Sequence, residues 1–461
     1  MSTTLDRKSL IQWAITIIGP LLVLLIPTSG GFSWDIKIFF TITAFIILVV
    51  AFELLDLVVS AIMLPTLYVL SGITDAATAF SPWTLTVTWL IVGTFVLTAA
   101  LEECGLLKRI AYWCIKRCGG TYTGTLYGLF VVGIILAWVT FCNAYMIVIS
   151  LSYGICKAMG YKRGKESAII MMVGSLGVTS VMCFVYNPLM MGLMEQGARL
   201  VVPDFTMTWY NQIFICAPML ICYFLFIFVL TKIYKTKNFT FHGGKEYFEQ
   251  EYASMGKLTV QEKKAAVILF ILMVYLLSSP IHGYSSDYGF MFLPYLMFVP
   301  GINVASNKAL KSLNFGAICF CVACFSIGTV GVALGLDDLI SSSISPVLSN
   351  TSSITILYTI MIFGIIANLC LTPSAMMTCL PPVVASVVIG LGMDPIAPLF
   401  ALYYSTDMVF LPHEVPALLI LFTFGMISMK DFIVMNGIKV GIMLVFIGII
   451  MIPYWMLIGV F

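Results

Sequence analysis

Long apolar segments, separated by short polar ones, follow one another along the whole chain. The longest contain about 20 residues, the length that an α-helix needs to cross a bilayer. The pattern therefore predicts an all-α polytopic membrane protein. Its membrane-spanning helices are expected near residues 10–27, 36–50, 53–71, 84–104, 121–139, 166–195, 209–233, 264–280, 287–303, 314–335, 353–371, 396–412, 416–429 and 437–460.

One polar segment near the middle of the chain interrupts this pattern. Residues 232–264 read KIYKTKNFTFHGGKEYFEQEYASMGKLTVQEKK and carry many charges of both signs. We interpret this segment as a cytoplasmic loop with a short amphipathic helix. It separates a first half, residues 1–231, from a second half of similar length, residues 265–461.

Basic residues indicate which side of the membrane each loop faces, because cytoplasmic loops are enriched in Lys and Arg. The N-terminus is then expected to be cytoplasmic and the C-terminus outside. No Lys or Arg occurs between Lys311 and Lys430, so residues 368–395 should approach from the outside. The clusters expected on the cytoplasmic side are Arg7–Lys8, Lys108–Arg117, Lys157–Lys165, Lys232–Lys264, Lys308–Lys311 and Lys430–Lys439.

Two regions, one in each half, share the same order of features. Residues 137–160 and residues 372–392 each contain a helix that ends near a glycine. Each is followed by a span with a proline near its middle, residues 166–195 and 396–429. We interpret these regions as re-entrant hairpins and broken spans of two inverted repeats, a signature of secondary transporters. Irregular backbone at membrane depth must be buried in protein or line a cavity.

Three ionisable residues, Asp407, His413 and Glu414, lie inside the second broken span, next to Pro412 and Pro416. Charged groups at membrane depth are costly and are functional candidates. A carboxylate there could bind a proton, a cation or a cationic group of a substrate. Alternatively, it pairs with His413 or caps a broken helix, whose N-terminus favours an anion. We predict that Glu414, Asp407 and His413 take part in ion coupling.

Polar residues of the first half supply further candidates. The amide of Asn143 can donate to a carboxylate and offer an oxygen to a cation, and Asn187 stands next to Pro188 in the matching broken span. The segment VGSLGVTS could supply oxygens to an ion, or its small residues could simply allow close helix packing. Its candidate residues are Gly174, Ser175, Gly177 and Thr179.

The composition excludes several functional classes. Of the 461 residues, 61% are hydrophobic and 10% are charged, whereas soluble domains carry about 25% charged residues. The net charge of +2 gives no indication of a nucleic-acid partner. Of the three histidines, only His413 lies in an apolar segment, so an enzyme or a metal centre is not expected. The cysteines lie mostly in apolar segments and are interpreted as packing residues.

Three segments, residues 51–73, 94–113 and 410–432, resemble the divalent anion/sodium symporter family of the ion transporter superfamily. The similarity extends over nearly the whole chain. The resemblance implies a homodimer in which each protomer has a scaffold domain and a moving transport domain with two re-entrant hairpins. It also implies an elevator motion that couples sodium to the uptake of di- or tricarboxylates or sulfate.

The resemblance further implies where a substrate would bind. The Ser-Asn-Thr triplets of the family align with Phe141-Cys142-Asn143 and with Thr372-Pro373-Ser374, and a Thr-Pro-Pro-Asn motif aligns with residues 415–418. Most of the family's hydroxyl and amide groups are replaced at these positions, which leaves the substrate and the coupling ion open. The expected substrate-binding residues are Asn143, Cys142, Thr372, Ser374, Val415, Pro416 and Asn187.

These observations predict a secondary active transporter in a bacterial inner membrane. A cation gradient, of sodium or protons, would drive the uptake of a small organic anion such as a di- or tricarboxylate by alternating access. An alternative is a proton-coupled transporter of a neutral, zwitterionic or cationic solute on the same scaffold, and a remote alternative is an intramembrane enzyme. The expected partners are the small-molecule substrate, the lipid bilayer and a second copy of the chain. No nucleic acid, no cofactor and no metal beyond a coupling sodium ion are expected.

Overall fold

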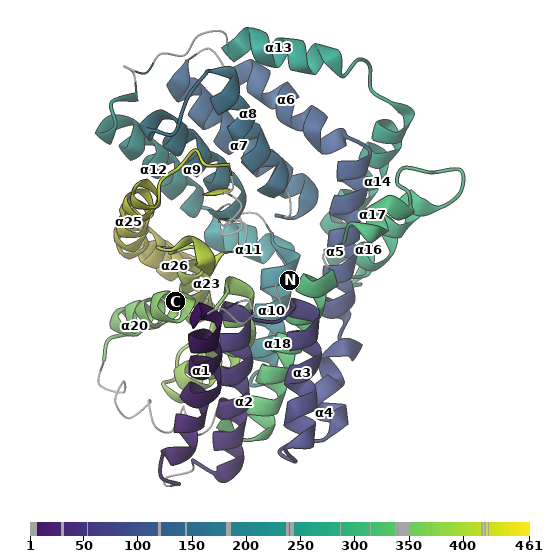
Figure 1. Cartoon of the computed structure of the whole chain (residues 1–461). Coiled ribbons are helices and arrows are strands. Elements are labelled where there is room, and N and C mark those ends of the chain that lie inside the picture. The colour runs from purple at the N-terminus through teal and green to yellow at the C-terminus, as the bar shows by residue number, and fades with distance from the viewer. Residues whose placement is uncertain are drawn as a thin grey trace.

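The computed structural model (Figure 1) is helical, and no strand occurs among the residues that it describes. This confirms the predicted all-α class. The described residues are 7–28, 32–52, 54–118, 121–142, 145–180, 186–236, 239, 244–285, 287–313, 315–336, 339, 351–369, 371–415, 418, 421–422 and 424–461.

The lower part of the molecule in Figure 1 is a bundle that contains helices from both halves of the chain. Inside it, the ring of Phe39 stacks on that of Tyr68 at 5.4 Å, and the Tyr68 hydroxyl is 2.6 Å from that of Thr43. The bundle consists of α1 (Arg7–Leu21), α2 (Trp34–Ala51), α3 (Leu57–Leu70), α4 (Ala76–Phe80) and α18 (Phe315–Ala333).

The upper part of the molecule contains several helices of the first half. Here α7 and α8 both pack against α9. Small residues allow this approach, because a Cβ atom added at Gly133 would lie 2.2 Å from the Gly177 carbonyl oxygen. The helices of this part are α6 (Leu106–Cys118), α7 (Tyr122–Thr140), α8 (Tyr145–Ala158), α9 (Lys165–Thr179) and α12 (Met219–Ile233).

Three of the described helices are long and apolar enough to cross a membrane. They are α5 (Thr86–Glu103), α7, and the continuous helix Met429–Ile458, which joins α25 (Met429–Phe446), a π-helical turn and α26 (Ile452–Ile458). Two bent pairs also qualify: α11 (Trp209–Cys216) with α12 at 48°, and α21 (Pro373–Cys379) with α22 (Pro381–Gly390) at 44°. Several other expected spans are apolar helices of fewer than 18 residues, such as α3.

The last helix differs from the prediction in one respect that matters for the site. It begins at Met429, ahead of the span expected at 437–460, because Ser428 caps it by accepting a hydrogen bond from the Asp431 N–H (3.1 Å). Lys439 therefore lies inside this helix and is 3% exposed. Lys439 is thus a buried residue within a helix and not part of a solvated basic loop.

The two regions expected to be hairpins contain helices that end in the same way. After α8, Gly160 has a φ of 67°, and the Tyr161 N–H donates to the Cys156 carbonyl (2.9 Å). After α22, Gly392 has a φ of 73°, and the Met393 N–H donates to the Val388 carbonyl (2.9 Å). Both ends form the glycine-dependent Schellman motif.

Both expected broken spans are interrupted. The first consists of α9 and α10 (Pro188–Arg199), and the second begins with α23 (Ile396–Ser405), which precedes a 3₁₀ turn at Pro412–Glu414. The helix before the second expected hairpin is α20 (Ser353–Asn368), and it packs against α23. In Figure 1, α20, α23 and α25 lie near one another in the middle of the molecule.

The polar segment 232–264 is attached to α6 by a buried ion pair. The Arg109 guanidinium lies 2.7 Å from a Glu262 carboxylate oxygen and also donates to the carbonyls of Gly256 (2.8 Å) and Met255 (3.0 Å). Glu262 belongs to the capping box of α14, whose N-cap is Thr259. The helices of this part are α13 (Gly244–Ser254), α14 (Val260–Leu277), α15 (Ser279–His282), α16 (Asp287–Phe292) and α17 (Asn307–Lys311).

Candidate functional site

The interrupted ends of α9 and α23 meet inside the protein. Helix α9 ends at Thr179 and α23 ends at Ser405. Just beyond these ends, the Ser180 hydroxyl donates a 2.7 Å hydrogen bond to Asp407 Oδ1. The two broken spans, far apart in the sequence, are thus joined by a direct polar contact at a point where both helices have stopped.

Asp407 forms a buried ion pair with Lys439. The Lys439 Nζ atom is 2.9 Å from Asp407 Oδ1 and 3.3 Å from the Ser180 hydroxyl. The second carboxylate oxygen, Oδ2, accepts a 3.1 Å hydrogen bond from the Tyr223 hydroxyl of α12. Asp407 and Lys439 are 1% and 3% exposed, so both charges are withdrawn from solvent.

The burial of these charges makes each depend on the other. Removing one partner of a buried pair costs about 3–5 kcal/mol, because it leaves an uncompensated charge. A pairing of Asp407 with His413 stays a prediction, because the side chain of His413 lies outside the described residues. The partner that the structure gives Asp407 is Lys439.

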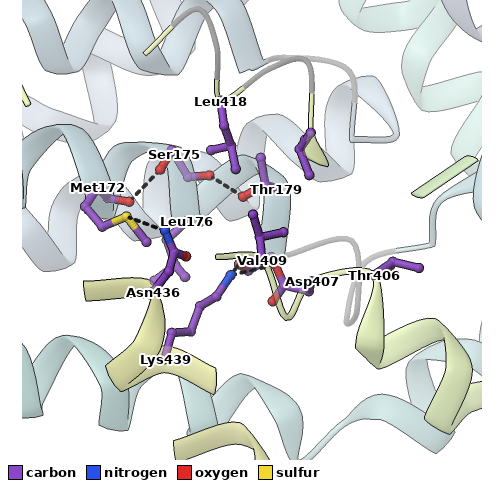
Figure 2. A pocket seen from close by; sticks show the side chains of 12 residues that line it. Met172, Ser175, Leu176, Thr179, Thr406, Asp407, Val409, Leu418, Asn436 and Lys439 are labelled. Carbon is purple, nitrogen blue, oxygen red and sulfur yellow. Dashed lines mark hydrogen bonds and ion pairs between the residues drawn. The ribbon is translucent and has the colours of Figure 1, made fainter. Parts of the chain in front are cut away.

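A small cavity lies beside the ion pair (Figure 2). It has room for about one water molecule. Asn436, one helical turn before Lys439 on α25, lines the cavity. Its Nδ2 donates to the Phe432 carbonyl, and its buried Oδ1 has no hydrogen-bond partner among the described residues. The lining residues are Met172, Ser175, Leu176, Thr179, Ser180, Thr406, Asp407, Val409, Val415, Leu418, Asn436 and Lys439.

The helix ends give the cavity a negative field. The last carbonyl groups of a helix lack intrahelical partners, and the C-terminal end carries the negative pole of the macrodipole. The last turn of α9 and the residues just after α23 both line the cavity. The Asp407 carboxylate adds a full negative charge. A cation is therefore favoured between these ends, and the Lys439 ammonium is placed there.

Glu414 accepts hydrogen bonds from the backbone of its own segment. Its Oε1 accepts hydrogen bonds from the N–H groups of Leu411 (2.6 Å) and Phe410 (3.0 Å), and its Oε2 accepts one from Asn368 Nδ2 (3.0 Å). The side chain is 1% exposed and is not among those lining the cavity. Glu414 thus links the broken span to the end of α20.

Thr372 and Ser374 lie together at the start of α21. The two hydroxyls are 3.2 Å apart, and Thr372 caps the helix by accepting from the Ala375 N–H (3.4 Å). Asn368, at the other side of this turn, has a buried Oδ1 that accepts no hydrogen bond from the part of the chain that the structure describes. The turn between α20 and α21 thus combines two hydroxyls with a free acceptor.

The candidates of the first half fall into two groups. Ser175 and Thr179 line the cavity beside the ion pair. Gly174 and Gly177 lie at helix contacts instead, since an added Cβ would lie 1.9 Å from the Ser152 hydroxyl or 3.1 Å from the Gly133 Cα. Asn187 is the N-cap of α10, where its Oδ1 accepts from the Met190 N–H (3.3 Å).

The tip of the first expected hairpin has unusual backbone geometry. Phe141 and Cys142, which follow α7, have φ angles of 51° and 70°. Such left-handed conformations are uncommon for residues with a Cβ and cluster at functional sites. Asn143 and Pro416 lie outside the described residues. Val415, next to Pro416, lines the cavity with Asp407.

Four residues of this site were missed by sequence reasoning: Lys439, Ser180, Tyr223 and Asn436. The only available signal was the pair Asn436 and Lys439, three residues apart in an otherwise apolar segment. Residues at this spacing share one helix face. In the part of the chain that the structure describes, no three His, Cys, Asp or Glu residues form a metal-binding group.

Comparison with known families identifies the class of protein. The family model described as "Sodium:sulfate symporter transmembrane region" matches residues 7–461. The chain belongs to this family. The resemblance to the divalent anion/sodium symporters is thereby confirmed. Membership of this family makes the chain an integral membrane protein of a transporter family rather than an enzyme.

Individual relatives are distant. A protein named "Membrane protein" from Cupriavidus necator is 24% identical over 336 residues, which are 66% of this chain and 64% of the relative. The match thus spans less than two thirds of that relative's length. The crystal structure of the Alcanivorax borkumensis YdaH transporter is similar in fold, with a TM-score of 0.59 and 16% identity, over 85% of this chain and 89% of the YdaH chain. MtrF of Neisseria gonorrhoeae gives a TM-score of 0.49 and 15% identity, over 81% and 80% of the two chains.

Proposed function

We propose that this transporter carries a small organic anion, such as a di- or tricarboxylate, into the cell by alternating access, driven by a cation gradient. The observation that carries the proposal is the meeting of two broken spans at Ser180 and Asp407, beside a cavity. Broken helix ends that meet at membrane depth are where secondary transporters bind substrate and coupling ions.

The arrangement of helix ends supports an anionic substrate with a coupled cation. Breaking the first span leaves both a C-terminal end, that of α9, and an N-terminal end, that of α10. Free N–H groups at a helix N-terminus attract anions, whereas C-terminal carbonyls attract cations. Asn187 stands at the N-terminal end, and Asp407 with Lys439 at the C-terminal ends. One interrupted span thus offers complementary places to the two solutes.

The wider organisation is proposed on the same grounds. The order α7, α8 and α9 is matched by α20, α21 with α22, and α23, and α8 and α22 share the same glycine-dependent end. This supports two repeats, which we propose to be inverted in the membrane. We further propose a homodimer with an elevator motion in a bacterial inner membrane, with the N-terminus cytoplasmic and the C-terminus outside.

A second candidate function is a proton-coupled transporter of a zwitterionic or neutral solute. The specific observation that favours it is the presence of both charges, Asp407 and Lys439, beside the same cavity. If the pair separates during transport, each charge could bind the opposite charge of an amino acid. The cation-coupled anion transporter is preferred because it also agrees with the family.

Uptake of labelled succinate into proteoliposomes tests the proposal. We expect time-dependent accumulation above that of protein-free liposomes, driven by an inward cation gradient, and inhibition by unlabelled citrate or sulfate. Lys430→Gln removes one positive charge from an exposed position on the same helix as Lys439. It is the control for a general effect of charge on this helix and should take up succinate like the wild-type chain. Folded protein that takes up amino acids but no succinate under any gradient would favour the second candidate.

A further inference from the structure

We propose that Lys439 is a built-in cation, which occupies the place of a coupling sodium ion between the two broken spans and leaves the proton as the coupling cation. The inference rests on the proposed function, because it identifies the coupling site of that transporter. It concerns a residue of the last helix, outside both broken spans.

The surroundings of the Lys439 ammonium are those of a bound hard cation. Its Nζ atom contacts oxygen atoms of Asp407 (2.9 Å) and Ser180 (3.3 Å), and oxygen is the ligand that hard cations prefer. An ammonium has three donors, and two of these have partners among the described residues. The lining atoms come from the last turn of α9 and the end of α23, where two helix dipoles present their negative poles.

Among the described residues that line the cavity, one negative charge, that of Asp407, faces one positive charge, that of Lys439. The groups that face Asp407 are Lys439 from α25, Tyr223 from α12 and Ser180 from the end of α9. Cys222 of α12 also lies close enough to interact electrostatically with both charges. A sodium ion placed here would add a second positive charge beside the ammonium, in a cavity with room for about one water molecule.

A proton that binds at this site can do what a binding sodium ion would otherwise do. Binding of a proton to the Asp407 carboxylate neutralises it, and the ammonium of Lys439 is then released from its ion pair. The site gains one positive charge, which can move with an anionic substrate. Glu414, seven residues further along the same segment, is satisfied by two backbone N–H groups and Asn368 and is not needed for this step.

Thermal unfolding of the purified full-length protein in detergent tests the inference without any substrate. The unfolding temperature is compared in sodium chloride and in choline chloride at equal ionic strength. For the wild-type chain we expect the same value in both salts. The variant Lys439→Ala lacks the ammonium that balances the Asp407 carboxylate. We expect sodium to raise the unfolding temperature of this variant by several degrees relative to choline, as a ligand that binds only the native state does.

Two further variants keep the test decisive. Lys430→Ala, on the same helix but exposed, should remain insensitive to sodium. If Lys439→Ala does not fold, Lys439→Gln, which retains most of the side-chain volume, takes its place. A sodium-specific rise in the wild-type chain would overturn the inference. A folded Lys439 variant that shows no preference for sodium over choline would overturn it as well.

This experiment separates the inference from the proposed function. Sodium-insensitive wild-type protein, with a sodium-stabilised Lys439 variant, supports the role of Lys439 even if succinate is not taken up. In that case only the proposal that the substrate is a di- or tricarboxylate is contradicted. Conversely, sodium-driven succinate uptake by a wild-type chain that sodium stabilises would support the transporter and overturn the role of Lys439.

Discussion

Two buried ion pairs in this transporter have similar burial but very different surroundings. The charges of Arg109 and Glu262 are enclosed by backbone: the guanidinium also donates to Gly256 and Met255, and the carboxylate accepts from the Thr259 N–H (2.7 Å). The charges of Asp407 and Lys439 lie instead beside a cavity lined by helix ends.

The difference indicates different roles. The Arg109–Glu262 pair joins α6 to the polar segment and the start of α14, and its hydrogen bonds leave it no freedom to exchange partners. The Asp407–Lys439 pair joins three elements that meet at an interruption, next to the unpartnered Oδ1 of Asn436. The first arrangement suits a fixed attachment. The second suits a pair that opens and closes during transport.

The largest expected effect is the loss of transport in Asp407→Asn. The substitution leaves the Lys439 ammonium buried without its counter-charge, which costs about 3–5 kcal/mol. We expect transport per folded protein to fall to the background of protein-free liposomes, because an amide can neither balance the Lys439 ammonium nor bind the coupling proton. Arg109→Gln should reduce the yield of folded protein while each folded molecule keeps its activity. Initial uptake rates, normalised to monodisperse protein, distinguish the two. Equal transport activities per folded molecule in Asp407→Asn and Arg109→Gln would contradict the different roles assigned to the two ion pairs.

Double substitutions sharpen the comparison. Replacing both members of a buried pair by apolar residues of similar size is often neutral for stability. We therefore expect Asp407→Leu with Lys439→Met to recover the unfolding temperature lost in either single variant, but not transport. Arg109→Met with Glu262→Leu should recover stability, and transport should follow. Recovered transport in the Asp407–Lys439 double variant would show that the pair is only structural.

A smaller effect is expected for Glu414→Gln. The carboxylate accepts from the Phe410 and Leu411 N–H groups through one oxygen and from Asn368 through the other. An amide can replace only one of these acceptors, so a buried donor loses its partner at a cost of about 1–3 kcal/mol. We expect a lower unfolding temperature and an unchanged pH profile of transport. A shifted pH profile in this variant would assign the proton to Glu414 instead of Asp407.

The smallest effect concerns the pH dependence of stability at Glu262. Burial raises the pKa of this carboxyl, but the hydrogen bonds from Arg109 and Thr259 outweigh it and hold the pKa below its ordinary value of 4.5. The unfolded chain then binds the proton more readily, so the stabilisation is present above about pH 4.5 and is lost as the pH falls below it. The difference in unfolding temperature between wild type and Glu262→Gln should therefore shrink on acidification. A difference that is independent of pH would contradict this.

Much of the fold, but less of the site, could be predicted from the sequence. Helices such as α5 and α7 were predictable because their apolar residues are continuous over a span length. The glycines at 160 and 392 marked helix ends because only a residue without a side chain adopts a positive φ at low cost. Asp407 and Glu414 were recognisable as special because they interrupt an apolar segment.

The partners of these charges could not be predicted. Ser180, Tyr223 and Lys439 come from three other elements, and nothing in their local sequence indicates which carboxylate they contact. Lys439 was misleading because it follows Lys430 within ten residues and resembles part of a basic loop. Only the start of the helix at Ser428, set by its cap, places Lys439 three turns inside and out of solvent.

Proton flux is the most direct test of the claim that the meeting point of the broken spans is a proton-coupled transport site. Proteoliposomes with a pH-sensitive dye inside would receive external succinate in sodium-free buffer. We predict internal acidification with the wild-type chain and with Lys430→Gln, and none with Asp407→Asn. Succinate uptake that requires sodium and moves no protons would contradict the account.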